Sequence, residues 1–436
     1  MNAKINLLSL LFVSCSMFLL SSCEKEVYNP SKVDKTTDLV VPEGFDWALT
    51  RGVTISMESK NGTYASFYLD KDCEDLVAEM PVQAGKSSTK LELPTASTKI
   101  WVKFPAGEGK EEVMEVAVKQ KATTKAGDAG SWTADSLFPD YAENSSNTMF
   151  AKYQPTKGQY GTIMFEDMWP EIGDYDFNDY VVNYNIVAEN KMDQNDFQNV
   201  YVTMNLKLRA IGGSKPYRFC VRIGANPAVA SMDLRKENVT LTDVNITPNV
   251  VDAKVEMLES TKYAVLAFTG FEKLKSLTGG NFYNTQKDHL VDNSQTPIIT
   301  IKFTVNKPGL DVQNLFNGFG SEFAFDYFLQ NTDNNREIHF IDTPPTDMYT
   351  GYENDKKDGN TTFYCSDKQF VWALKAPVEM AWCVETIDIK NVYDEFPEWV
   401  RRGGDWLEGN SNWDSNRQWY KRPTMNEKIY IDCKKH

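Results

Sequence analysis

Short runs in which every second residue is apolar recur along most of the chain. The first series falls between residues 39 and 120, at Val53–Met57, Tyr64–Leu69, Lys90–Leu93, Lys99–Phe104 and Val113–Val118. Alternation of this kind buries one face of a strand, so the series predicts a small antiparallel β-sandwich. Asn61 and Gly62 stand between the first two runs. They predict a hairpin turn, because both residues tolerate positive φ.

A second and longer series of strand-like runs fills residues 140–425. These runs are 162–165, 181–187, 200–208, 218–223, 239–244, 263–268, 298–305, 323–328 and 370–375. The run from Val200 to Leu208 alternates throughout, so it predicts a strand with one buried and one solvated face. The two series together predict an all-β chain, built mainly of antiparallel β-sandwich domains.

Only one segment, Ile387–Val400, carries apolar residues at helical spacing. We expect Pro397 to kink or split this helix and Gly403-Gly404 to end it. The fold class therefore includes a short C-terminal helical segment.

The first 23 residues follow a different pattern, with an apolar run at Ile5–Leu20 behind Lys4. At about 16 residues this run has the length of an export signal and falls short of the roughly 20 that a spanning helix needs. It ends in Leu20-Ser21-Ser22-Cys23, which resembles the lipobox of bacterial lipoproteins. The resemblance implies lipidation at Cys23, which becomes the new N-terminus, and a lasting membrane anchor. A plain secretory signal cleaved nearby is the alternative.

These patterns divide the chain into six predicted segments. They are a lipoprotein signal peptide (1–22), a tether (23–38), a small β-sandwich (39–120), a linker (121–139), a larger β domain (140–425) and a C-terminal tail (426–436). The linker is assigned from small and polar residues beginning at Lys121, which are typical of a domain boundary.

The net charge and the cysteines of the chain argue against several kinds of partner and metal site. The net charge of −15 argues against nucleic acid as a partner and is compatible with cation binding. The cysteines beyond Cys23 are widely spaced and odd in number, and none lies in a CxxC pair, which argues against zinc and against a disulfide scaffold. Cys365 could pair with Cys383, or both could be buried thiols.

Acidic side chains are concentrated between Tyr160 and Tyr184. Five carboxylates and one amide occur there within fourteen residues, namely Glu166, Asp167, Asp174, Asp176, Asn178 and Asp179. Like charges this close repel unless a cation neutralises them or they splay into water. Alternation at 174, 176 and 178 would point three oxygens to one side, which suits Ca²⁺. The sequence therefore predicts a calcium site, with an ion-free solvated turn as the alternative.

The aromatic residues interleaved with these acids, Tyr175, Phe177 and Tyr180, are expected to point the other way, into the core. The loop is not an EF-hand, because its sixth position is Asp179 instead of glycine and a strand-like run follows it.

The same segment carries a family resemblance. The string FEDMWPEIGDYDFNDYVVNY resembles the opening motif of the LruC domain of bacterial lipoproteins and secreted proteins. Further matches at Leu208–Gly213, Arg336–Phe340, Trp372–Pro377 and Trp419-Tyr420 extend the resemblance over residues 140–425. Membership implies an envelope location and an all-β body, and it carries over no enzymatic activity.

The sequence thus predicts a non-catalytic, membrane-anchored lipoprotein of the outer membrane, facing the periplasm or the cell surface. Its β domain would present a binding or adhesion surface to a glycan or an envelope protein. Trp406, Trp413 and Trp419 could stack on sugar rings, or they could pack in the core.

Two other functions remain open from the sequence. A glycoside hydrolase would need paired carboxylates, but Glu166 and Asp167 are adjacent and would face opposite sides of a strand. The other is an accessory subunit of a fimbrial or envelope assembly. The chain has three histidines, and we expect His339 to be a structural residue.

Overall fold

The computed structural model describes residues 33–120, 131–191, 199–224, 234–278, 281–309, 312–318, 325–356, 361–404, 418–424 and 429–430. The predicted signal peptide, Cys23, Trp406 and Trp413 lie outside these ranges. Within them, no helix has the length and apolar character needed to span a bilayer.

The prediction of an all-β chain is confirmed, and the alternating runs form strands. Val53, Ile55 and Met57 are buried on one face of their strand, as the alternation predicted. The strands are β1 (Thr50–Ser59), β2 (Thr63–Tyr68), β3 (Leu76–Val82), β4 (Gly85–Pro94), β5 (Lys99–Gly107), β6 (Lys110–Gln120), β7 (Trp132–Leu137), β8 (Met149–Gln154), β9 (Gly161–Phe165), β10 (Tyr180–Lys191), β11 (Val200–Ala210), β12 (Tyr217–Ile223), β13 (Val239–Thr247), β14 (Lys254–Met257), β15 (Val265–Thr269), β16 (Ile298–Val305), β17 (Phe325–Asn331), β18 (Glu337–Ile338), β19 (Ala373–Ala376), β20 (Trp382–Cys383) and β21 (Ile429–Tyr430).

Helices in the described residues are short. The α-helices are α2 (Val312–Gly318), α3 (Tyr352–Asp355) and α4 (Phe396–Arg401). The 3₁₀ helices are η2 (Thr36–Asp38), η4 (Lys236–Asn238), η5 (Phe271–Thr278), η6 (Lys287–His289), η7 (Asn293–Gln295), η8 (Ile389–Asn391) and η9 (Trp419–Lys421).

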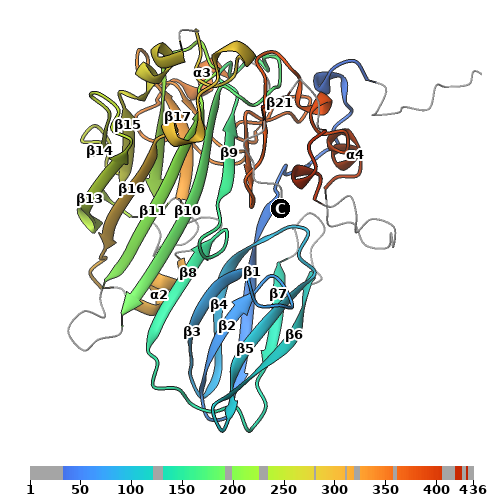
Figure 1. Ribbon diagram of the computed structural model, residues 1–436, viewed down its shortest axis with the longest axis vertical. Helices are drawn as coiled ribbons and strands as arrows, with labels where there is room; N and C mark the ends of the chain where they lie inside the picture. The colour runs from blue at the N-terminus through green and yellow to red at the C-terminus, as the bar shows by residue number, and fades with distance from the viewer. Residues whose placement is uncertain are drawn as a thin grey trace, which may run out of the picture.

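The molecule has two halves, the first built of β1–β7 and the second of β9–β21. A continuous path of hydrogen-bonded strands runs through both, in the order β13-β16-β11-β10-β8-β3-β2-β5-β6-β7-β1-β4. The strand shared by the halves is β8. It pairs with β3 at Ala78↔Lys152 and with β10 at Ile186↔Gln154, and Figure 1 shows it running from the lower half to the upper half. The two halves are therefore joined by a sheet as well as by the chain.

Buried basic side chains cross this junction. Lys152 Nζ donates hydrogen bonds to the carbonyls of Lys90 and Phe316, at 3.0 and 3.2 Å. Lys375 Nζ on β19 lies 2.7 Å from Glu92 Oε1 on β4, and both side chains are largely buried. These contacts bind the first half to the second.

The first half differs from its prediction in two places. Asn61-Gly62 does not form a hairpin, because β1 pairs with β4 and β7 whereas β2 pairs with β3 and β5. The turn instead carries the chain between strands that are not hydrogen-bonded to each other. In addition, β7 lies within the segment predicted as a linker and pairs in parallel with β1, with Ala134 opposite Ile55.

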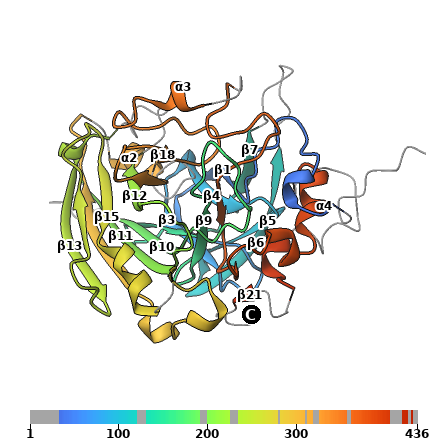
Figure 2. The same ribbon diagram turned by 90° about the horizontal axis from the view of Figure 1, so that it is seen from above.

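The second half is a sandwich. Its second sheet has the order β14-β15-β12-β17-β18 and packs against the sheet that contains β16, β11 and β10 (Figures 1 and 2). Phe219, Tyr327, Leu206 and Phe303 belong to the core between these layers. Alternating burial along β11 confirms the face predicted for Val200–Leu208.

A separate core underlies the C-terminal segment. It joins Phe45 and Trp47 to Phe396, Trp399 and their neighbours. Figures 1 and 2 show the N-terminal helix η2 beside α4. Residues 33–38, predicted as part of a tether, are thus held against the C-terminal segment.

The predicted helix Ile387–Val400 forms two shorter helices, η8 and α4. The segment is therefore split, one of the two outcomes expected for Pro397. Pro397 stands in the first turn of α4, where its missing N–H costs nothing. Gly403 and Gly404 end α4 as predicted, with N–H groups that donate to Val400 and Trp399. Strand β21, within the predicted tail, pairs with β20.

The cysteines of the described residues, Cys73, Cys220, Cys365 and Cys383, are thiols that form no disulfide with one another. Cys365 and Cys383 are therefore buried thiols and not a disulfide.

Candidate metal centre

The acidic residues lie in the connection between β9 and β10, which are paired at Phe165↔Tyr180. Three backbone hydrogen bonds hold the two ends of this loop, residues 166–179. Glu166 N–H donates to the carbonyl of Trp372 at 2.9 Å. Gly212 and Gly213 N–H groups donate to the carbonyls of Asn178 and Asp179, at 3.0 and 3.1 Å. The loop is thus framed by the C-terminal segment and by the chain that follows β11.

Backbone conformation coils the loop tightly. Gly173, Tyr175 and Phe177 all have positive φ, at 75°, 62° and 53°. For the two aromatic residues this conformation costs about 1–3 kcal/mol each, so the surroundings must enforce it. Both rings are buried and lie 4.6 Å apart between centroids, which confirms that the interleaved aromatics face the core.

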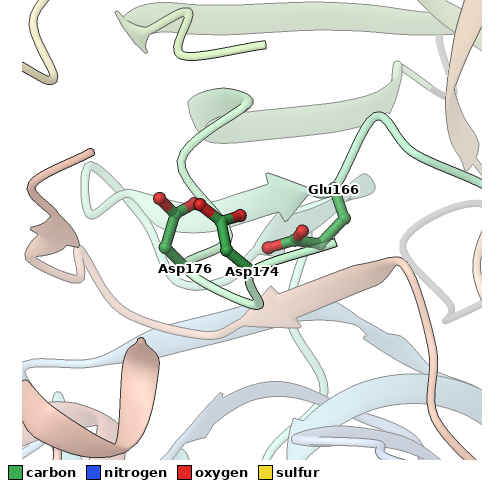
Figure 3. Close-up of side chains that lie close together, drawn as sticks. All are labelled: Glu166, Asp174 and Asp176. Carbon is green, nitrogen blue, oxygen red and sulfur yellow. The ribbon is translucent and has the colours of Figure 1, made fainter. Parts of the chain in front are cut away.

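Three of the predicted acids converge. One carboxylate oxygen from each of Glu166, Asp174 and Asp176 lies within 4.8 Å of the other two, and Figure 3 shows the three side chains directed toward one another. Glu166 and Asp176 are buried, whereas Asp174 is exposed and opens the cluster to solvent. Such a spacing would let one small cation touch all three groups.

Two buried oxygens in the loop lack a hydrogen-bond partner among the described residues. Glu166 Oε1 accepts from Phe177 N–H at 2.6 Å, but Glu166 Oε2 has no donor. Asn178 Nδ2 donates to Asp176 Oδ2 and to the carbonyl of Cys383, at 2.7 and 3.2 Å, while Asn178 Oδ1 has no donor. An unpaired buried acceptor costs about 1–3 kcal/mol and is a recognised sign of an absent ion.

The pKa values of the buried carboxyl groups also fit a cation site. Burial raises the pKa of Glu166 well above its ordinary value, and the charges of Asp179 and Asp176 raise it further. Burial and the charge of Asp174 likewise raise the pKa of Asp176 well above the usual range. A cation among these groups would reverse both effects, because it favours the ionised forms.

Two other predicted ligands, Asp167 and Asp179, do not belong to the group of three that converges. Asp179 Oδ2 accepts from Asp167 N–H at 2.6 Å, and Asp167 Oδ2 accepts from Lys215 N–H at 2.9 Å. Burial raises the pKa of Asp179 well above its ordinary value, and the charge of Asp167 adds to this. These two carboxylates therefore bind backbone N–H groups and shape the loop.

The sequence did not single out Glu385 or the paired glycines as parts of the site. Glu385 does not belong to the acidic run of residues 166–179. Its pKa is nevertheless raised to about 7, first by burial and then by the charges of Asp174 and Asp167. A Cβ at Gly213 would lie 2.5 Å from Asp167 Oδ2, and one at Gly212 would overlap Asn178 Oδ1. A side chain at either position would displace a side chain of the site, which accounts for the two glycines after Ile211.

Two other residues discussed from the sequence, Trp419 and His339, are buried inside the fold. Trp419, proposed as a residue for stacking on sugars, is fully buried against Tyr393 and Phe396, so that role is wrong for it. His339 is buried directly after β18, with Nδ1 2.9 Å from Asp326 Oδ2 and Nε2 3.0 Å from Glu337 Oε2. Burial lowers the pKa of His339, but the two carboxylates outweigh it and raise the pKa to about 9.

Comparison with known proteins gives a family match and a fold match. Residues 198–413 match the family described as a domain of unknown function, DUF4842, and the acidic loop precedes the matched residues. The LruC resemblance stays a prediction. The structure is similar to that of a candidate lipoprotein from Bacteroides ovatus, with a TM-score of 0.60 and 18% identity over 85% of this chain and 99% of that chain. At this identity the likeness concerns the fold.

A second structure that matches is the full-length major pilin SpaD from Corynebacterium diphtheriae. Its TM-score is 0.17 at 11% identity, over 66% of this chain and 63% of that chain, which is too low to carry an argument. The comparison with curated proteins gives no match.

Proposed function

We propose that this chain is a lipid-anchored envelope protein of the LruC type, whose acidic loop binds Ca²⁺ and whose β domain presents a non-catalytic binding or adhesion surface. The LruC assignment is supported by the string FEDMWPEIGDYDFNDY. Calcium binding is supported by the contacts of the loop, and the anchor by residues 20–23 together with the description of the Bacteroides ovatus relative.

The observation that carries the calcium proposal is the convergence of Glu166, Asp174 and Asp176 around a buried oxygen, Glu166 Oε2, that has no donor within the described chain. All the converging ligand atoms are carboxylate oxygens, which hard cations prefer, and no histidine or cysteine belongs to this group as a soft-metal site would require. Oxygens up to 4.8 Å apart match ligands on opposite sides of Ca²⁺, whose Ca–O distances are about 2.4 Å.

Thermal unfolding with and without calcium tests this proposal. A ligand at a hundredfold excess over its Kd stabilises the folded state by about 2.7 kcal/mol. For a chain of this size that stabilisation corresponds to a Tm increase of about 3–5 °C. Asp176→Asn keeps the shape of the side chain but removes a charge, so this variant should lose the calcium-dependent increase. Asp333→Asn, in an exposed turn, is the matched control and should retain it. An identical wild-type Tm in Ca²⁺ and in EGTA would refute calcium binding.

The lipid anchor is tested separately from the metal. Cells that express the wild-type chain should incorporate labelled fatty acid into it, and Cys23→Ala should abolish the label. Protease treatment of intact cells then distinguishes the cell-surface face from the periplasmic face. Labelling that persists in Cys23→Ala would overturn lipidation at this cysteine.

A binding role without catalysis is the proposal for the rest of the molecule. Glu166 is fully buried and bonded to backbone, which is a poor position for a group that must reach a glycosidic bond. A glycan panel tested for released reducing ends should therefore give no activity, whereas pull-down from envelope fractions should recover a partner. Release of reducing ends that Glu166→Gln abolishes would favour a hydrolase instead.

A further inference from the structure

A second set of oxygens lies beside the three converging carboxylates. Its first member is Asn178 Oδ1, on a side chain with no solvent exposure. The two hydrogen bonds from Asn178 Nδ2, to Asp176 Oδ2 and to the carbonyl of Cys383, fix which end of the amide is the oxygen. Asn178 Oδ1 therefore points toward Gly212 as an acceptor, and it has no donor among the residues that the structure describes.

The second member of the set is Glu385, which comes from the C-terminal segment just after β20. Its backbone N–H donates to the carbonyl of Thr285 at 3.0 Å, and Thr285 Oγ1 donates to Glu385 Oε2 at 2.9 Å. A Cβ placed on Gly212 would overlap Asn178 Oδ1 and lie 2.9 Å from Glu385 Oε2. The amide oxygen and the carboxylate therefore face the same space, which is available because residue 212 has no side chain.

The two sets are close enough to interact electrostatically, because the charge of Asp174 raises the pKa of Asp176 in the first set and of Glu385 in the second. Glu385 is not a member of the described group whose oxygens all lie within 4.8 Å, the span across one calcium ion. In this geometry Glu385 lies outside the group of three that converges at the first site.

We propose a second divalent-cation subsite next to the first, formed by Asn178 Oδ1 and the Glu385 carboxylate. The inference rests on the proposed calcium function and deepens it. Because Glu385 belongs to the C-terminal segment, the second ion ties that segment to the acidic loop. It adds to the bond from Thr386 N–H to Asp176 Oδ2, which spans 210 residues of sequence at 2.8 Å.

Counting bound ions tests the second subsite. We expect native mass spectrometry of the full-length protein in detergent, with Ca²⁺ added, to find two ions per chain. Glu385→Gln keeps the side-chain shape and its bond to Thr285, and this variant should bind one. Glu379→Gln is the matched control, because Glu379 lies in the same segment but pairs with Lys207 at 2.9 Å, and it should bind two.

The outcomes separate the two proposals. A wild-type chain that binds no calcium would refute the proposed function itself. One ion in both the wild type and Glu385→Gln would overturn the second subsite and leave the first intact. Loss of all calcium in Glu385→Gln would also overturn it, because Glu385 would then belong to a single site.

A second variant covers the case in which Glu385→Gln fails to fold. Thr285→Val removes the hydroxyl that holds Glu385 Oε2 but retains the Glu385 carboxylate. Loss of such a supporting contact typically lowers metal affinity by about 10- to 100-fold. Calorimetric titration of Thr285→Val with Ca²⁺ should therefore show one site weakened at least about tenfold. Unchanged affinity at both sites would contradict the proposal.

Discussion

The buried pair between Glu92 and Lys375 offers a direct test of how firmly the two halves are joined. Their charged atoms lie 2.7 Å apart, and the side chains are only 4% and 13% exposed. Gln154 Nε2 donates to the second oxygen of Glu92 at 2.7 Å. The pair thus connects β4 of the first half to β19 of the second, with β8 contributing the third partner.

Removing one member leaves the other as an uncompensated buried charge. Lys375→Met or Glu92→Leu should each lower the free energy of unfolding by about 3–5 kcal/mol. Replacing both removes both charges, so the double variant should lose much less than the sum of the two single losses, with about 1–3 kcal/mol remaining for the lost hydrogen bond from Gln154 Nε2 to Glu92. The wild type, the two single variants and the double variant form a double-mutant cycle. The coupling energy from this cycle should exceed that of any exposed ion pair.

Urea unfolding followed by tryptophan fluorescence measures these differences. With a slope of about 3 kcal/mol per M, each single variant should lower the midpoint by at least about 1 M. The continuous sheet through β8 predicts one transition for both halves. Lys60→Met is the control, because Lys60 and Asp140 form a pair that is 65% and 75% exposed and is worth at most about 1 kcal/mol. Single variants that lose less than the control, or two separate wild-type transitions, would refute this reasoning.

Three further predictions concern other parts of the fold. The pKa of His339 rises from 6.5 to about 9 on folding, so its stabilising contribution is complete below pH 6.5 and is lost as pH rises through 9. The free energy of unfolding, measured across this range, should therefore fall with rising pH. His339→Gln should abolish this pH dependence. Gly213→Ala would place a Cβ 2.5 Å from Asp167 Oδ2, so we expect a lower Tm and weaker calcium binding by titration. Trp399→Ala removes a fully buried ring and should cost about 3–5 kcal/mol by urea unfolding, with faster amide exchange at Phe45 and its neighbours.

Each of these has a result that contradicts it. A His339→Gln variant that keeps the wild-type pH profile would assign the loss to another group. For Gly213→Ala the control is Gly351→Ala, where φ is negative and the nearest atom to a Cβ lies at 3.4 Å, and equal effects on calcium binding would argue against the close approach. Unchanged exchange at Phe45 in Trp399→Ala would mean that the N-terminal segment is held by other contacts.

Much of the fold could be predicted because a strand that is buried on one face has a period of two. Val200–Leu208 and the aromatics Tyr175 and Phe177 occupy the faces that their spacing indicated. Pairing partners could not be predicted in the same way. Asn61-Gly62 favours a turn locally, but whether the next strand pairs with the previous one depends on contacts far along the chain. Strand β7 was missed because Ala134 and Ser136, its buried residues, are small and one is polar.

The acidic loop was visible in the sequence because its ligands are close together along the chain. Nothing local distinguishes Glu385, a single carboxylate between Val384 and Thr386, because the fold alone brings it to Asn178. Of the six predicted residues, three converge, two bind backbone N–H groups, and Asn178 does neither. This division also depends on the positive φ of Tyr175 and Phe177, which composition does not indicate.

The contacts of Thr36 determine which part of the fold first bears a pulling force applied through the N-terminal chain. Its N–H donates to Asp388 Oδ2 at 2.7 Å, and its hydroxyl donates to the other oxygen of the same carboxylate. Tension applied to the chain upstream of Thr36 is therefore transmitted first to the C-terminal segment, three residues beyond Glu385, and only then to β1. Bound cations at the acidic loop would stiffen the element that bears this load.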